Sequence, residues 1–282
     1  MTFHRFEDFT SNLLTPHLSS ARGPVIEGSY MYFCLVRKEP GTGSELHYHP
    51  NELLIFPLSG KFNIIVGKDR RVIAPGTFVH VPAYARHSVK ATEEGPAQYL
   101  YMKDKTWTVV GLAADEAVPD KAMSVEEVNR LYGSGRLATR KSEPERSKVI
   151  IEGLNTCFYP MHGAFDGSVS SARSVKWVEG QRMAFGLFEV PGGYREASRR
   201  SPHELFVYVL DGAVDAEVNG AKKTMKTGDI AHVRRGETCR FSNETQKVAR
   251  YAVLCSTPWL EDRIDSMTPA EVEQAQLQMK PN

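Results

Sequence analysis

The sequence predicts an all-β protein with two tandem barrels of the same kind and a short helix after each barrel. Two observations support this prediction: an internal repeat that spans most of the chain, and short strand-like runs separated by glycine and proline turns. Many short strands with such turns at close spacing favour a sandwich or a barrel over alternating strands and helices.

The repeat is found by displacing the chain by 152 positions, which aligns residues 25–107 with residues 177–259 without an insertion or deletion. Eighteen of the 83 pairs are identical, whereas ordinary composition gives roughly five matches over such a window. Self-similarity of this length indicates a tandem duplication of one structural unit. We therefore expect a first domain at residues 1–132, a linker at 133–147 and a second domain at 148–282.

The strand-like runs of the first repeat alternate with turn residues. The runs cover residues 30–38, 52–58, 61–66, 78–81 and 99–102. After the first barrel, Ser124 and Glu127 have the spacing of a capping box, which predicts a helix that begins there. After the second barrel, Thr268-Pro269-Ala270-Glu271 predicts another helix start. Residues 1–24 and 147–176 lie outside the repeat, and we expect them to pack across the two units or across a dimer.

The composition limits the classes of partner. The 282 residues include 35 basic and 34 acidic side chains, so a net charge of +1 does not favour a nucleic acid. No apolar run approaches 18 residues, and no apolar stretch follows the N-terminus, so we expect neither a membrane span nor a signal peptide. The four cysteines lack paired Cys-x-x-Cys spacing. These features predict a cytoplasmic protein.

Three histidines of the first repeat suggest a metal site. His47 and His49 are separated by one residue, so in a strand their side chains point to the same face. His87 lies 38 residues after His49 and can reach them if the strands fold back as a barrel. The counterparts of the three histidines in the second repeat are Arg199, Ser201 and Cys239. The sequence therefore predicts a metal site in the first barrel and a degenerate one in the second.

The spacing around these histidines resembles that of the cupin superfamily. Gly41-x5-His47-x-His49, ending at Gly60, is similar to the first cupin motif. Gly76-x5-Pro82-x4-His87 is similar to the second, with Tyr84 where the family often has glycine. The second repeat keeps both frames, at residues 193–212 and 228–243. The resemblance covers most of the chain and implies a bicupin, with two jelly-roll barrels in one polypeptide.

The resemblance leaves the fourth metal ligand open. The family usually has a glutamate separated by six residues from the closing glycine, where this chain has Leu53. Glu52 stands one residue earlier, and a shift of one residue turns a strand side chain to the opposite face unless a bulge intervenes. Its counterpart Glu204 persists without the histidines, which suggests a structural partner such as an arginine or a backbone amide. Glu52 as a ligand and a three-histidine site are both possible.

The expected metal is a divalent transition ion, with iron preferred and manganese, nickel, copper or zinc also compatible with imidazole ligands. Without a carboxylate ligand the site would favour a small anionic or chelating substrate. Tyr48 and Tyr84 are the candidate catalytic residues, which would orient that substrate. Four further residues on the same strands and turns could line the pocket or simply pack in the core, namely Phe56, Arg86, Tyr101 and Met102.

Several other residues have structural and functional interpretations. His80 and its counterpart His232 are better explained by packing or turn bonding than by metal binding, because His232 lacks neighbouring ligands. Cys239 has no histidine beside it in sequence, which argues against a nucleophile. A set of arginines surrounds the degenerate site and could bind an anion or form a solvated surface. These arginines are Arg199, Arg200, Arg234, Arg235 and Arg240.

Three functions agree with these residues. The first is a metal-dependent dioxygenase that acts on a small phenolic, enolisable or diketone-like compound, as the resemblance to ring- or diketone-cleaving cupin dioxygenases implies. The second is a redox-neutral isomerase, lyase or hydrolase that uses the metal as a Lewis acid. The third is a non-enzymatic binding protein for a small molecule. The second barrel would supply stability, a lid or a dimer interface, and a homodimer is expected.

Overall fold

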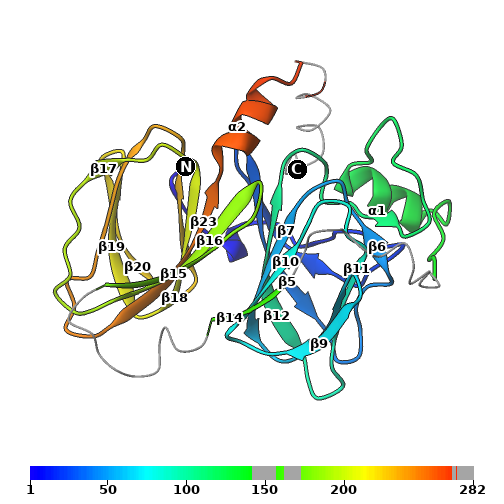
Figure 1. Ribbon diagram of the computed structural model, residues 1–282, viewed down its shortest axis with the longest axis horizontal. Coiled ribbons are helices and arrows are strands. Elements are labelled where there is room, and N and C mark those ends of the chain that lie inside the picture. The colour runs from blue at the N-terminus through cyan, green and yellow to red at the C-terminus, as the bar shows by residue number, and fades with distance from the viewer. Residues whose placement is uncertain (142–156, 162–172, 269–270, 272–282) are drawn as a thin grey trace. The chain divides into compact units, whose positions relative to one another are not determined.

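The computed structural model describes residues 1–141, 157–161, 173–268 and 271 (Figure 1). Two helices occur within this part of the chain, α1 (Val125–Gly133) and α2 (Pro258–Asp265), and the other regular elements are strands and one 3-10 turn, Phe6–Asp8. Neither helix is long and apolar enough to cross a membrane. The chain divides into two compact units, one for each repeat, and this confirms the predicted all-β tandem architecture.

The first repeat forms two antiparallel sheets (Figure 1). One sheet has the strand order β14-β10-β7-β12-β5-β3-β2, and the other has the order β13-β6-β11-β8-β9. Short strand β4 (Val25–Glu27) pairs with β5. The strands of the first sheet are β2 (Asn12–Leu13), β3 (Arg22–Gly23), β5 (Met31–Lys38), β7 (Leu53–Ser59), β10 (Thr77–Val81), β12 (Ala97–Asp104) and β14 (Phe158–Pro160). Those of the second are β6 (His47–Tyr48), β8 (Phe62–Val66), β9 (Asp69–Ile73), β11 (His87–Ala91) and β13 (Leu112–Ala113).

Alternation along these strands separates the barrel interior from its outer face. In β7, Leu53 and Ile55 join the buried core, and in β11 the core residues Val89 and Ala91 share their face with His87. The residues between them in sequence point outward. The sequence pattern therefore directs His87 into the barrel, since a strand side chain two positions from an inward residue is also inward.

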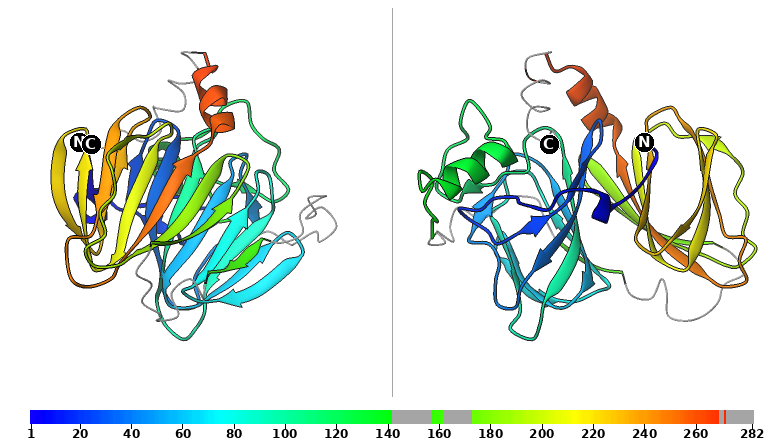
Figure 2. Two further views of the ribbon diagram at one scale, coloured as in Figure 1. Left: turned by 60° about the vertical axis from the view of Figure 1, so that its left-hand side comes forward. Right: turned by 180° about the vertical axis from the view of Figure 1, so that it is seen from behind.

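The second repeat repeats this plan. One sheet has the order β1-β21-β18-β23-β16-β15 and the other has the order β17-β22-β19-β20. Figure 2 shows its yellow and orange strands as facing layers. The strands of the first sheet are β1 (Phe3–Arg5), β15 (Ser174–Glu179), β16 (Met183–Val190), β18 (Leu205–Asp211), β21 (Asp229–Val233) and β23 (Ala249–Ser256). Those of the second are β17 (Arg199–Arg200), β19 (Ala213–Val218), β20 (Ala221–Lys226) and β22 (Thr238–Ser242).

One edge strand of each unit comes from the sequence that lies before the other repeat. Strand β1 pairs antiparallel with β21, and Met1–Asp8 belong to the compact unit of the second repeat. Strand β14, which precedes the second repeat, pairs in the same way with β10 of the first. The correspondence extends to single bonds: His80 N donates to Cys157 O and His232 N donates to Thr2 O, both at 2.8 Å. Residues 1–8, which the sequence analysis assigned to the first barrel, thus complete the second.

The predicted N-cap of α1 is confirmed, because Ser124 Oγ accepts a hydrogen bond from Glu127 N at 2.9 Å. Near the C-terminus, Thr268 N donates to Glu271 Oε2 at 2.8 Å and Glu271 N donates to Thr268 Oγ1 at 3.4 Å, but the helix predicted to begin there lies outside the described residues. Helix α2, directly after β23, is an additional short helix that was not predicted from the sequence. Part of the predicted linker, residues 142–147, also lies outside the described part.

Glu204 bonds with a segment from before the second repeat, Gly28–Tyr30, which belongs to the same compact unit. Its carboxylate accepts hydrogen bonds from the backbone amides of Ser29 and Tyr30, at 2.7 and 2.9 Å, and lies 2.8 Å from His232 Nε2. The side chain is fully buried, so each carboxylate oxygen exchanges its hydration for these partners. The structural role expected for this glutamate is therefore confirmed, with a histidine added to the expected backbone amides.

Replacing Glu204 by alanine should lower the free energy of unfolding by about 3 kcal/mol, because two amides and one imidazole lose a buried acceptor. Urea denaturation followed by circular dichroism measures the change. Glu244→Ala is the matched control, since this glutamate is 55% exposed and its ion pair with Arg195 should contribute less than about 1 kcal/mol. Equal effects of the two substitutions would contradict the structural role of Glu204.

Lys38 is buried in the first barrel, where its Nζ lies 3.3 Å from Ser19 Oγ. Burial, and secondarily the charge of Lys90, lowers its pKa from 10.5 to about 7. A lowered lysine pKa means that the unfolded chain binds the proton more readily, so the stability present above pH 10.5 is lost as the pH falls towards 7. Lys38→Met should remove this contribution, whose slope is at most about 1.4 kcal/mol per pH unit.

The measurement is the difference in unfolding free energy between Lys38→Met and the unmodified protein at several pH values from 7 to 10.5. We expect the stabilisation by the substitution to grow as the pH falls. Lys61→Met serves as the control, because the Lys61 side chain is 50% exposed. A difference that does not change with pH would show that Lys38 is solvated in the folded state.

Candidate metal centre

The three predicted histidines converge inside the first barrel. His47 in β6 lies directly opposite His87 in β11, and the next strand, β13, flanks His47 on its other side. The ring centroids of His47, His49 and His87 are 4.3 to 5.0 Å apart. One nitrogen from each ring lies within 4.8 Å of the other two. An ion with bonds of about 2.0–2.1 Å would draw the three nitrogens to within about 4.2 Å of one another.

Backbone carbonyls fix the orientation of two of the rings. His47 Nδ1 donates to Glu45 O and His87 Nδ1 donates to Ala85 O, each at 2.8 Å. These bonds place the proton on Nδ1 and leave the lone pair of Nε2 free for a ligand bond. In the described part of the chain, the buried Nε2 of His87 has no hydrogen-bond partner. This unsatisfied nitrogen is what a metal site requires.

Burial keeps the rings neutral. It lowers the pKa of His87 to about 4. Burial also holds the pKa of His47 and of His49 well below the usual value, with further lowering from His87 for His47 and from Lys103 for His49. Since a protonated imidazole cannot coordinate a cation, these shifts prepare all three side chains as ligands at neutral pH.

Gly111 provides space beside the rings. A Cβ at this position would lie 2.7 Å from His47 Cδ2 and 3.2 Å from His49 Cδ2. The backbone is held in place because Gly111 N donates to Thr15 Oγ1 at 3.0 Å. The absence of a side chain at Gly111 therefore lets the backbone pass directly over the two imidazoles. Gly111 carries no motif of its own in the sequence and was not predicted as a site residue.

Glu52 lies on the other face of its sheet. Its Oε1 is 2.7 Å from His80 Nε2, just as Glu204 lies against His232 in the second repeat. His80 is opposite Leu54 across the strand pair, and both alternate with inward core residues. Residue 52 therefore shares the outer face with residues 54 and 80. Of the two arrangements considered for the metal, this geometry favours the three-histidine site.

Tyr48 also points away from the imidazoles, because it alternates with His47 and His49 along the strand. Its hydroxyl donates to Glu116 O at 2.5 Å, and the Arg86 guanidinium lies 4.3 Å from its ring centroid. Tyr84 lies beside it, with ring centroids 6.5 Å apart, and is 49% exposed. These side chains form a cluster outside the ring of histidines.

Tyr84 adopts a left-handed backbone conformation, with φ of +65°. Its counterpart in the second repeat is Gly236, with φ of +83°. A residue other than glycine is strained at such an angle. The turn thus explains why the cupin pattern often has glycine here, and it makes Tyr84→Gly a substitution that the backbone can accept.

Lys103 is a further residue near the site that the sequence analysis did not single out. It follows Tyr99 and Tyr101 on the inward face of β12 and is completely buried. Its Nζ donates to Val109 O at 3.0 Å and lies 5.4 Å from the ring centroid of Tyr101. Burial holds the pKa of Lys103 well below the usual value. The signal available in the sequence was a lysine at an inward position of an apolar strand.

The remaining residues considered for the pocket differ in whether their strand position faces the barrel interior or its outer face. Tyr101 belongs to the inward core, whereas Phe56 and Met102 alternate with inward residues and face outward. In the second repeat, Arg199 pairs with Cys239 as His47 pairs with His87. Burial raises the pKa of the Cys239 thiol, so it stays protonated. This agrees with the prediction that Cys239 is not a nucleophile.

We expect the first barrel to bind one divalent ion. His49→Ala should weaken that binding by roughly 100-fold or more, because one of three ligands is lost. Glu52→Gln should leave the affinity nearly unchanged, since the amide of the introduced glutamine can still bond with His80 outside the site. Metal titration followed by elemental analysis measures both. A comparable loss in Glu52→Gln would identify Glu52 as the fourth ligand.

Comparisons with known proteins agree with this duplicated plan. A family model described as the cupin domain matches residues 34–103 and again residues 186–255. No curated protein sequence matches the chain. The Mn(II)-containing oxalate decarboxylase of Bacillus subtilis has a similar solved structure, with a TM-score of 0.63 and 16% identity over 99% of this chain and 84% of that one.

AerE from Microcystis aeruginosa is also similar, with a TM-score of 0.60 and 13% identity over 91% of this chain and 99% of that one. At such identities the structural likeness concerns the fold. Together with the two matches to the cupin model, the duplicated barrels and the converging histidines define the family. The chain is a bicupin and belongs to the cupin superfamily.

Proposed function

We propose that this protein is a metal-dependent enzyme that acts on a small organic anion, with the metal held by His47, His49 and His87. The observation that carries the proposal is the convergence of three buried, neutral imidazoles with the Nε2 lone pair of His87 unsatisfied. The three ligands bring no negative charge, so a divalent ion would keep its full charge in a barrel interior of low polarity. An anionic, chelating substrate compensates that charge.

The chain's own residues would prepare the site in two ways. The carbonyls of Glu45 and Ala85 hold the rings of His47 and His87 in the tautomer that offers Nε2. Lys103 and Tyr101 share the inward face of β12 and supply an amine and a hydroxyl that could hold the substrate. We propose these two residues for substrate orientation, because Tyr48 and Tyr84, predicted for that role, lie outside the ring of histidines.

Within this class we propose oxidative cleavage of a phenolic, enolisable or diketone-like substrate. A transition metal such as iron would supply a Lewis acid and a redox partner for dioxygen. The protein's contribution is to bury the imidazole ligands and so keep them neutral. The homodimer and the cytoplasmic location expected from the sequence stay predictions.

A redox-neutral reaction is the second candidate, and a specific observation favours it. Solved structures similar to this chain over 99% of its length are those of a decarboxylase with Mn(II) centres. A decarboxylase cleaves a carbon–carbon bond of a carboxylate, so its substrate belongs to the same class of small chelating anion. Under this alternative the metal is manganese and dioxygen is not consumed.

Oxygen-electrode and carbon dioxide measurements separate the two candidates. The Fe(II)-loaded protein should consume dioxygen with phenols, flavonols or β-diketones, whereas carbon dioxide release from oxalate or a related acid by the Mn(II)-loaded protein without dioxygen would support the decarboxylase. His87→Ala should reduce turnover by at least roughly 100-fold, because a ligand is lost. Tyr84→Gly is the control and should retain turnover. No turnover in either assay by metal-loaded protein would contradict an enzymatic role.

A further inference from the structure

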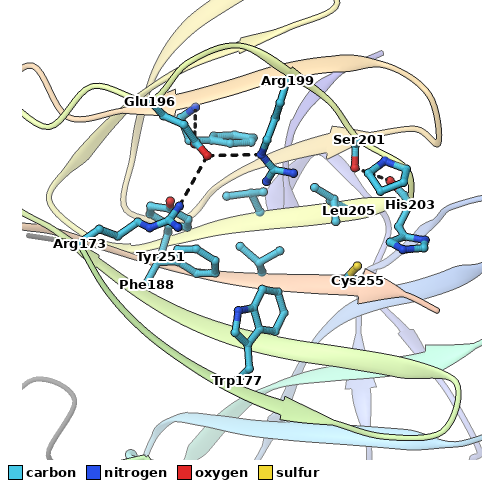
Figure 3. Close-up of a pocket in the computed structure, with 14 residues that line it drawn as sticks. Arg173, Trp177, Phe188, Glu196, Arg199, Ser201, His203, Leu205, Tyr251 and Cys255 are labelled. Carbon is cyan, nitrogen blue, oxygen red and sulfur yellow. Dashed lines mark hydrogen bonds and ion pairs between the residues drawn. The ribbon is translucent and has the colours of Figure 1, made fainter.

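The second barrel contains a cavity of about 130 Å³ (Figure 3). Arg199 and Ser201, the counterparts of His47 and His49, are among its lining residues. Cys255, the counterpart of Lys103, also lines it. The cavity therefore occupies the part of the second barrel that corresponds to the metal centre of the first. Without imidazole ligands, this space has a different chemistry.

The walls of the cavity are flat and apolar. Phe188 and Tyr251 stack with their ring centroids 4.9 Å apart and their planes at 11°. Trp177 meets Phe188 edge to face at 5.5 Å, and Figure 3 shows its indole below the other two rings. Leu205 and Val253 complete the apolar lining. A cavity of roughly 150 Å³ with apolar walls can hold benzene, and this cavity, at about 130 Å³, is of nearly that size.

Two guanidinium groups lie at the cavity with one carboxylate between them. Glu196 Oε1 is 3.6 Å from Arg173 Nη1 and 3.3 Å from Arg199 Nε (Figure 3). These three side chains leave one net positive charge. In the part of the chain that the structure describes, the terminal nitrogens of Arg199 make no hydrogen bond. They are the group that binds a carboxylate in a bidentate manner.

Glu196 is the residue that positions both cations. Its side chain is only 14% exposed, and its second oxygen accepts a hydrogen bond from Phe241 N at 3.4 Å. The Arg173 guanidinium also lies 5.5 Å from the ring centroid of Phe188. Both guanidinium groups are thus held at the edge of an aromatic wall. An anion that carries an aromatic ring could pair with the net positive charge and pack its ring against the aromatic side chains.

We propose that the second barrel binds a small aromatic carboxylate in this cavity, without a metal. The carboxylate would bond with Arg199 and Arg173, and the ring would lie among Trp177, Phe188 and Tyr251. The thiol of Cys255 in the lining stays protonated, because burial raises its pKa to about 12. The site is therefore a binding site with no covalent step, and it does not depend on the function of the first barrel.

Isothermal titration calorimetry of chelator-treated full-length protein with benzoate tests the proposal. Benzamide lacks the charge and acetate lacks the ring, so each should bind at least about 10-fold more weakly than benzoate. Arg199→Gln should weaken benzoate binding by a similar factor. Arg200→Gln is the matched control, because the neighbouring Arg200 donates to Gly236 O outside the cavity lining and should leave the affinity within about twofold.

Two further variants locate the ligand. His49→Ala should bind benzoate as the unmodified protein does, which separates this cavity from the metal centre. Benzoate should quench tryptophan fluorescence, and Trp177→Phe should lose that signal while it retains calorimetric binding within about threefold. Arg173→Gln replaces Arg199→Gln if the latter fails to show a native thermal transition. Unchanged benzoate affinity in a folded arginine variant, binding lost only in His49→Ala, or no binding at millimolar benzoate would each overturn the proposal.

Discussion

The register between β6 and β11 is the constraint on which the rest of the site depends. It places His47 directly opposite His87, and strand alternation adds His49 to the same face. The pairing is fixed by backbone hydrogen bonds and by the inward core residues of β11, so the strands themselves bring the three rings together. A slip of one residue would turn the same side chains to the outer face and bring Tyr48 inward instead.

The second barrel shows that the strand register does not depend on which side chains occupy the paired positions. Arg199 and Cys239 occupy the paired positions there, and the strands still align. The barrel is stabilised by its buried core, to which valines from five strands contribute. The second barrel therefore keeps the same scaffold without these histidines, and its interior is lined by aromatic rings and guanidinium groups. The same barrel fold thus encloses a histidine cluster in the first repeat and a cavity with aromatic and arginine side chains in the second.

Both repeats also contain a glutamate–histidine pair on the outer face of a sheet. Glu52 with His80 and Glu204 with His232 have nearly equal oxygen–nitrogen distances, 2.7 and 2.8 Å. The backbone amides of His80 and His232 also bond in the same way to the segments before β14 and before β1. These shared contacts explain why the glutamates and histidines persist in both copies: they belong to the duplicated scaffold, whereas the inward histidines belong to one site.

The sequence by itself determined the duplication, the two barrels and the three histidines that converge in the first barrel, because a strand period of two and fixed glycine positions translate directly into faces and turns. It also predicted that Glu204 has a structural partner, since that residue persists without a metal. Lys103, Gly111 and the cavity around Phe188 and Tyr251 were decided only by the tertiary structure. They depend on contacts between strands distant in sequence, and no spacing along one strand encodes which side chains meet across a barrel interior. The exchange of β1 and β14 between the repeats has the same origin, because pairing partners are chosen by the folded sheet and not by order along the chain.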